Sequence, residues 1–168
     1  VVLVNIPTGT VSSLITDANL TGTIGNLMRL PGGDILVVET SNVERFTTTG
    51  LRVTAGGWPK VLQTTGSGIS ALSNGGFIHC STGTDVIRAY DANGTQTATA
   101  SSGIIGTTDV RDCQVGPNGQ VLAVFNGTTD TVRVYSDETL SSTVFSYSDT
   151  SILSDPRTAI FRPNGNIL

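Results

Sequence analysis

The 168-residue sequence is long enough for one domain with a buried core, and only 13% of its residues are charged. Its 13 acidic and 9 basic residues give a formal charge of −4, which argues against a nucleic-acid binder, because phosphate contacts need clustered Lys and Arg. No apolar run approaches the roughly 20 residues of a transmembrane helix, so we expect no membrane span.

The residue types favour β-structure throughout the chain. Strong helix formers are scarce, whereas β-branched residues and the turn formers Gly, Ser, Thr and Asn are abundant. From the N-terminus, Val1 to Val4 and Val11 to Leu14 predict two short strands joined by a polar loop. We therefore predict an all-β fold.

The next element, a hairpin with a Gly-containing turn, recurs along the chain. Its four copies share an apolar residue, a Pro/Ser/Gly/Asn turn and an aliphatic pair: Leu30-PGGDIL, Leu72-SNGGFI, Val115-GPNGQVL and Phe161-RPNGNIL. Repeats of 40 to 50 residues are typical of solenoids, propellers and arrays.

Each repeat contains the same order of predicted strands. A second strand covers Ile35 to Val38, Phe77 to Cys80 and Val121 to Val124, and a third covers Val43 to Phe46, Ile87 to Tyr90 and Val132 to Tyr135. A weakly apolar fourth strand such as Thr95 to Ser101 suits an outer edge. Four short antiparallel strands per repeat predict a β-propeller, with a β-sandwich as the less favoured alternative.

Residues 1–168 are predicted to form one propeller domain or segment of about four blades. The predicted boundaries are 1–25 (strands two to four), 26–68, 69–108, 109–155 and 156–168, the last being the first strand of a further or closing blade. The step from Val4 to Val11 equals that from Cys80 to Ile87, so the chain begins at a second strand. Three arrangements stay open: a blade split between the two termini, part of a larger ring, or a homo-oligomer that completes a ring.

The repeat pattern resembles that of the NHL, YVTN and gluconolactonase-like propellers, in which a Pro-Asn-Gly turn and an aliphatic strand precede Val-Arg-x-Tyr. Trp-Asp repeats are a poorer match, because no Trp-Asp dipeptide ends the third strand. The resemblance implies a fold rather than an activity, since these families include protein-binding scaffolds, extracellular lyases and metal-dependent lactonases.

Ligands of propellers usually bind where the loops entering the innermost strands converge. Two of these loops carry an Asp-x-Arg sequence at the same position of the repeat. Its side chains form either a polar rim that binds an anion or sugar, or local ion pairs. The candidate ligand-binding residues are Asp109, Arg111, Asp112, Asp155, Arg157 and Asn26. Four of them, Asp109, Asp112, Asp155 and Asn26, offer oxygen ligands for Ca²⁺ or Mg²⁺ in a lactonase-like alternative; otherwise we expect no cofactor and no metal site.

Other reactive residues have structural interpretations. His79 aligns with Val37 and Ala123, which predicts a hydrogen-bonded core histidine rather than a catalytic one. Cys80 aligns with Val38 and Val124, and Cys113 aligns with Met28, Ser70 and Ala159, so we expect two buried thiols, with a disulfide as the alternative. Trp58 is either an exposed partner anchor or a filler between blades, the second being favoured. Glycosylation patterns occur at Asn19, Asn93 and Asn126.

No nucleophile elbow or Cys/His pairing supports a hydrolase triad, so a catalytic residue is not predicted. We expect a non-enzymatic binding or structural module of an extracellular, cell-surface or periplasmic protein, with a protein or carbohydrate partner. The alternative is a lactonase-like hydrolase or lyase acting at the mouth of the central channel.

Overall fold

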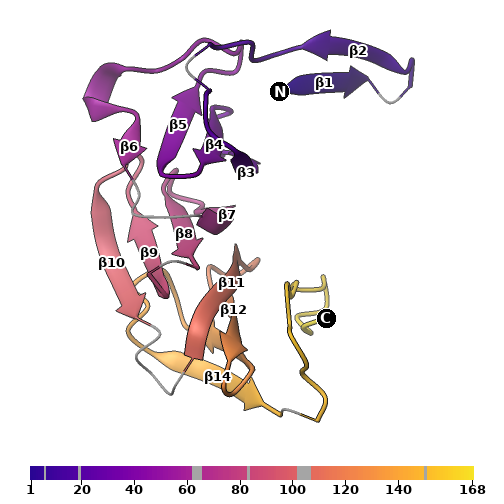
Figure 1. The fold of residues 1–168 in the computed structure, drawn as a ribbon, viewed down its shortest axis with the longest axis vertical. Coiled ribbons are helices and arrows are strands. Elements are labelled where there is room, and N and C mark those ends of the chain that lie inside the picture. Colours follow the sequence, from indigo (N-terminus) through magenta and orange to yellow (C-terminus); the bar gives the residue numbers. More distant parts are fainter. Residues whose placement is uncertain (6, 19, 62–65, 83, 102–106, 150) are drawn as a thin grey trace.

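The fold is taken from a computed structural model, which describes residues 1–168 except 6, 19, 62–65, 83, 102–106 and 150. The described part is almost entirely β-structure and forms an open arc (Figure 1). Its one helical turn is a 3₁₀ segment, η1 (Ala55–Gly57), and no helix among the described residues is long and apolar enough to cross a membrane. The all-β prediction is confirmed.

Three four-stranded antiparallel sheets make up most of the arc, and each corresponds to one predicted blade. Blade 1 contains β3 (Ile24–Arg29), β4 (Ile35–Glu39), β5 (Asn42–Phe46) and β6 (Lys60–Val61). Blade 2 contains β7 (Gly66–Ala71), β8 (Phe77–Ser81), β9 (Val86–Tyr90) and β10 (Gln96–Ser101). Blade 3 contains β11 (Thr107–Val115), β12 (Val121–Gly127), β13 (Thr131–Tyr135) and β14 (Thr143–Ser148).

The sheets begin at Ile24, Gly66 and Thr107, slightly before the blade starts expected at 26, 69 and 109. The chain starts with a separate hairpin of β1 (Val2–Asn5) and β2 (Thr10–Ser13), in which Val4 faces Val11. Cys80 faces Ile87 in the same way between β8 and β9, which agrees with the predicted second and third strands. A fourth strand in the expected 1–25 unit is absent from the described residues.

The last residues form the hairpin predicted around Asn164 and Gly165. Phe161 and Ile167 form an antiparallel bridge, and the backbones of Ile160 and Leu168 exchange two hydrogen bonds of 3.0 Å. This C-terminal hairpin packs on blade 3, whereas the β1–β2 hairpin lies at the other end of the arc (Figure 1). No strand pairing joins these two hairpins among the described residues.

The turn glycines correct the predicted alignment of the repeat. Each turn closes with a hydrogen bond from a Gly amide at positive φ to a carbonyl three residues earlier. The accepting residues are Leu30, Leu72, Gly116 and Arg162. The predicted pattern had instead aligned Val115 and Phe161 with Leu30 and Leu72. The equivalents of Cys113 are therefore Leu27, Ile69 and Ala159, and not Met28 and Ser70, because Cys113, Leu27 and Ile69 face Ala123, Val37 and His79 across the ladders.

The first strands β3, β7 and β11 lie side by side along the concave side of the arc. Hydrophobic clusters fill the space between neighbouring blades. Phe77 and Tyr90 stack with ring centroids 4.7 Å apart between blades 1 and 2, and Trp58 packs near them. Trp58 is 5% exposed, so it fills the space between blades as favoured from the sequence. The outermost strand β14 is exposed along its whole length.

Candidate functional site

Each first strand has an irregularity near its start, and this irregularity positions the predicted site residues. Register shifts precede Asn26 in β3, Gly68 in β7 and Asp112 in β11, which are equivalent positions. Bulges redirect side chains and often occur next to functional sites. Asn26 and Asp112 each accept a hydrogen bond of 2.8 Å from the amide of the following residue. The same local structure therefore recurs at both positions.

Asp112 links blade 3 to the segment that follows it. Its Oδ2 accepts a hydrogen bond from the hydroxyl of Thr158, the equivalent residue of the C-terminal segment. Its Oδ1 lies beside Gly68 of β7 on the other side. Because both oxygens are engaged between neighbouring first strands, Asp112 serves as a structural bridge along the concave face.

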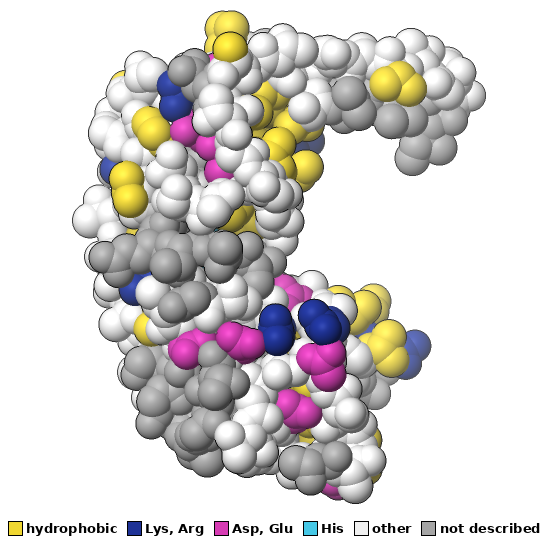
Figure 2. All heavy atoms as spheres, in the orientation of Figure 1, with side chains coloured by type: hydrophobic (Ala, Val, Ile, Leu, Met, Phe, Trp, Pro, Cys, Tyr) yellow, Lys and Arg dark blue, Asp and Glu magenta, His cyan; other side chains and the backbone are white. Residues whose placement is uncertain are grey.

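The two Asp-x-Arg sequences form ion pairs within themselves. Arg111 lies 2.8 Å from Asp109, and both side chains are about one-third exposed. Arg157 donates to Asp155 Oδ2 through Nε at 3.1 Å and Nη2 at 2.6 Å. Arg157 retains 68% exposure, so its remaining donors face solvent. Figure 2 shows acidic and basic side chains side by side on the lower part of the concave face.

The β12–β13 loop holds Asp155 in place, which the sequence did not reveal. Asp130 is 9% exposed, and its carboxylate accepts hydrogen bonds of 3.1 Å from the amides of Gly127 and Asp155. The side-chain amide of Asn126 donates to Asp155 Oδ1. Asp155 is thus fixed by the previous blade through Asn126 and Asp130, while its own Arg157 remains accessible.

Asp85 occupies the position of Asp130 in the preceding blade. It has a positive φ of 52°, and its Oδ1 is buried without a hydrogen-bond partner among the described residues. Burial raises the pKa of Asp85, and the negative charge of Asp109 raises this pKa further. The signal that would have identified both residues is their common spacing, two positions before Ile87 and Val132 in the third strands.

We call this set the charged rim; it comprises Asp85, Asp109, Arg111, Asn126, Asp130, Asp155 and Arg157. Asn26 is not part of it, because β7 separates β3 from β11. No group of three or more His, Cys, Asp or Glu side chains within the described residues is placed to hold a metal ion. The chemistry that the rim offers is hydrogen bonding and ion pairing, with guanidinium donors next to carboxylate acceptors.

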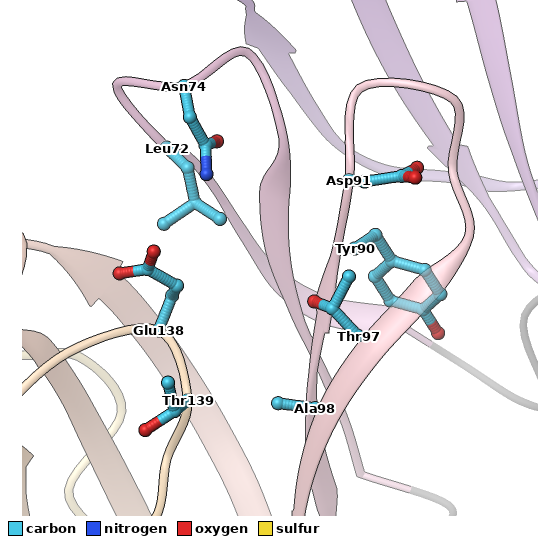
Figure 3. Close-up of a pocket in the computed structure, with 8 residues that line it drawn as sticks. All are labelled: Leu72, Asn74, Tyr90, Asp91, Thr97, Ala98, Glu138 and Thr139. Carbon is cyan, nitrogen blue, oxygen red and sulfur yellow. The ribbon is translucent and has the colours of Figure 1, made fainter.

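A separate hollow of about 290 Å³ lies between blades 2 and 3, at the edge of the sheets opposite the rim. Asn74 reaches it from the β7–β8 turn, Tyr90 and Asp91 from the end of β9, and Glu138 from the β13–β14 loop (Figure 3). The carboxylate of Glu138 points toward Leu72. The hollow is a shallow acidic notch between two blades.

His79 lies in the core, as predicted. The hydrogen bonds that we expected for it are not found in the described part of the chain. It is fully buried on β8 opposite Arg88, and neither ring nitrogen has a hydrogen-bond partner among the described residues. Burial and, second, the charge of Arg88 lower the pKa of His79 to about 4. The residue is therefore neutral at physiological pH and does not belong to the rim.

The three glycosylation patterns have different surroundings. Asn93 is an exposed turn residue, and Asn126 is engaged with Asp155 in the rim. Asn19 lies outside the described residues. Asn93 is therefore the candidate with open access, whereas modification of Asn126 would disturb the rim.

Comparisons with known proteins agree with the fold. No family model and no curated protein matches the sequence. The N-terminal part of BBS1, described in complex with ARL6DN, matches 95% of this chain and 49% of its own at a TM-score of 0.69 and 15% identity. A protein of unknown function from Bacteroides caccae matches 79% of this chain and 48% of its own, at a TM-score of 0.63 and 13% identity.

The Pan2 WD40 domain of Neurospora crassa matches 74% of this chain and 35% of its own, at a TM-score of 0.53 and 11% identity. This chain therefore spans about half or less of the length of these structures. WD40 domains are β-propellers, and the three sheets of this chain have the same four-stranded organisation. The fold is that of β-propeller blades.

Proposed function

We propose that this chain is a non-enzymatic binding module whose charged rim contacts a protein partner. The observation that carries this proposal is the fixed position of Asp155: Asn126 and Asp130 hold it, and it in turn orients the exposed Arg157. A preorganised guanidinium loses little conformational entropy when it binds a carboxylate of a partner. The BBS1 structure, which contains a bound protein, is consistent with this role.

The wider assignments are also proposals. The repeat supports a relationship to the NHL, YVTN and gluconolactonase-like propellers, and the low charge and Thr/Ser/Gly/Asn-rich loops support an extracellular, cell-surface or periplasmic location. We take residues 1–168 as one propeller segment. A carbohydrate partner is the alternative ligand for the rim, since Asp and Arg side chains also bind hydroxyl groups.

Further blades would cover apolar surface on blade 3. Val144 and Phe145 of β14 are 57% and 46% exposed, and β14 borders a hollow of about 260 Å³ lined mainly by apolar side chains. We propose that this surface continues into a larger ring, formed by the same polypeptide or by a second copy. The particle mass in solution, compared with 17.4 kDa for one chain, separates a monomer from an assembly.

Panning a phage-displayed random peptide library on the immobilised chain tests the protein-binding role. We expect selected peptides rich in Asp and Glu whose affinity falls at least about tenfold for Arg157→Ala, the loss of a charge-assisted pair. Arg162→Ala is the matched control, because Arg162 is an exposed arginine of the same segment and lies outside the rim. Selected peptides that bind both variants equally would contradict the role of the rim, and a glycan array provides the carbohydrate comparison.

The enzymatic alternative has its own test. Metal-dependent hydrolysis of aldonolactones, with a thermal shift in Ca²⁺ or Mg²⁺ that is lost in Asp109→Ala or Asp155→Ala, would replace the binding module by a lactonase-like enzyme. We expect neither hydrolysis nor a metal-dependent shift, because both carboxylates are already paired with arginine.

A further inference from the structure

Cys80 and Cys113 meet between two blades. Cys80 lies on β8 of blade 2 and Cys113 on β11 of blade 3, and both are buried in the hydrophobic cluster that joins these blades. Neither cysteine forms a disulfide in the structure. Their nearness depends on tertiary packing, since the two strands belong to different sheets.

Gly68 is the reason the two cysteines approach so closely. It pairs with Cys80 across the β7–β8 ladder, and a Cβ at Gly68 would lie 2.7 Å from Cys80 Sγ and 2.8 Å from the backbone nitrogen of Cys113. Cys80 Sγ and the nitrogen of Cys113 are therefore within about 5.5 Å of each other, the sum of these two distances. Because Gly68 has no side chain, Cys80 can approach the backbone of Cys113 here, next to Asp112 Oδ1.

The thiol of Cys113 interacts with Cys80. Burial is the first cause that raises the pKa of this thiol, and the interaction with the side chain of Cys80 is the second. A disulfide requires facing side chains with Cβ atoms about 3.5–4.5 Å apart, and the approach of Cys80 Sγ to the backbone of Cys113 across Gly68 is compatible with this geometry. We propose that Cys80 and Cys113 form a disulfide that joins blade 2 to blade 3, independently of the proposed binding function.

Thiol–disulfide exchange with a low-molecular-weight disulfide, such as oxidised glutathione, supplies the chemistry. The thiolate of one cysteine attacks the glutathione disulfide, forms a mixed disulfide and releases one glutathione thiolate. The thiolate of the other cysteine then attacks the protein sulfur of the mixed disulfide, forms the Cys80–Cys113 bond and releases the second glutathione. Two protein thiols are oxidised and one glutathione disulfide is reduced to two thiols, so atoms and electrons balance.

The burial of the pair determines when the reaction is fast. Burial, followed by the interaction with Cys80, raises the pKa of the Cys113 thiol well above its ordinary value, so little thiolate is present in the folded protein. We therefore expect slow oxidation of the native chain and rapid oxidation during refolding. Once formed, the disulfide is expected to resist external reductants, because its burial keeps their thiolates from reaching the sulfur atoms.

The experiment uses the full chain, unfolded in denaturant and refolded in excess oxidised glutathione or in excess reduced glutathione. After alkylation of free thiols, the oxidised sample should contain a trypsin product that joins residues 61–88 to residues 112–133. In the reduced sample both peptides should be alkylated. The oxidised monomer should also melt about 5–10 °C higher, since the bond closes a loop between two distant segments.

Cys80→Ser and Cys113→Ser serve as matched controls, each with a single thiol. Neither should show the joined peptide or a rise in melting temperature in glutathione-oxidised monomers. The peptide map of the unaltered chain remains decisive if a variant fails to fold. Two alkylated cysteines after refolding under oxidising conditions, glutathione adducts that do not resolve, or disulfides only between chains would overturn the proposal.

Discussion

Arg52 binds Glu44 through two hydrogen bonds of 2.8 Å, from Nε to one carboxylate oxygen and from Nη2 to the other. Glu44 lies on β5 at the position that Arg88 and Arg133 occupy in the next two blades, and it is 1% exposed. Arg52 comes from the turn after β5. The hydrogen bond to Glu44 raises the pKa of Arg52, although partial burial opposes this shift.

Arg52→Ala should destabilise the chain by about 2 kcal/mol, because it leaves a buried carboxylate without its counter-charge. The free energy of unfolding from urea titration at pH 7 measures the effect. Arg157→Ala removes an arginine that is also paired with a carboxylate but is exposed, and it should change the free energy of unfolding by less than about 0.5 kcal/mol. Equal effects of the two variants would show that burial of Glu44 does not determine the energy of this pair.

His79 should make stability depend on pH. The folded state keeps His79 neutral down to a pKa of about 4, whereas the unfolded chain protonates it near pH 6.5, so unfolding takes up a proton between these values. Stability contributed by the neutral ring is present above pH 6.5 and is lost as the pH falls. We expect a loss of about 2 kcal/mol between pH 6.5 and pH 5.

His79→Val tests this assignment, because Val37 occupies the equivalent core position in blade 1. Urea unfolding at pH 7, 6 and 5 gives the free energy of unfolding of both proteins. The contributions of the other titrating groups are the same in both and cancel when the two values are subtracted. The free energy of unfolding of the variant should therefore fall much less between pH 6.5 and pH 5 than that of the unaltered chain. Parallel pH profiles of the two proteins would mean that His79 is accessible to protons in the folded state.

Gly68→Ala should destabilise the chain by about 2 kcal/mol or more, because β7 and β11 leave no room for a methyl group. The added Cβ would lie 2.7 Å from Cys80 Sγ and 2.8 Å from both Asp112 Oδ1 and the backbone nitrogen of Cys113. Gly32→Ala is the control, since no atom lies within 4 Å of its Cβ position. Thermal unfolding should separate the two variants, and a tolerated Gly68→Ala would rule out the close approach of these strands.

Asp130→Ala should loosen the C-terminal segment. The substitution removes the acceptor of the Asp155 amide and of the Gly127 amide, at a cost of about 1–2 kcal/mol. Amide hydrogen exchange by NMR should become faster at Asp155. Asp137→Ala should leave this exchange unchanged, because the hydrogen bonds of Asp137 are made to Ser136 and Thr139 within its own loop.

Much of the fold was predictable because blade strands combine two local signals, a Gly turn and an apolar pattern. The second and third strands follow closely from these signals, and β8 and β9 match the predicted Phe77 to Cys80 and Ile87 to Tyr90 within one residue. The alignment of Cys113 with blades 1 and 2 was wrong by one position, because Gly116 stands where Leu30 and Leu72 precede their turns. In a strand, a one-residue shift moves a side chain to the opposite face.

The charged rim was only partly predictable. Both Asp-x-Arg pairs are visible in the sequence, since their members lie two residues apart on an extended segment. Asp130 and Asn126 act on Asp155 across a blade boundary, and only the packing of successive sheets brings them together. The missing hydrogen bonds of His79 could not be predicted either, because they depend on which side chains surround it in the core.

The repetition at the rim has an evolutionary consequence. Blade 3 begins with Asp109-x-Arg111 and carries Asp130, while the adjoining segments supply Asp85 before it and Asp155-x-Arg157 after it. A tandem duplication of this blade would bring Asp130 of one copy against Asp109-x-Arg111 of the next and so regenerate the same set of residue types at the new boundary. Deletion of the blade would place Asp85 next to Asp155-x-Arg157. Gain or loss of a whole blade would therefore keep the same residue types, an Asp and an Asp-x-Arg sequence, at each boundary.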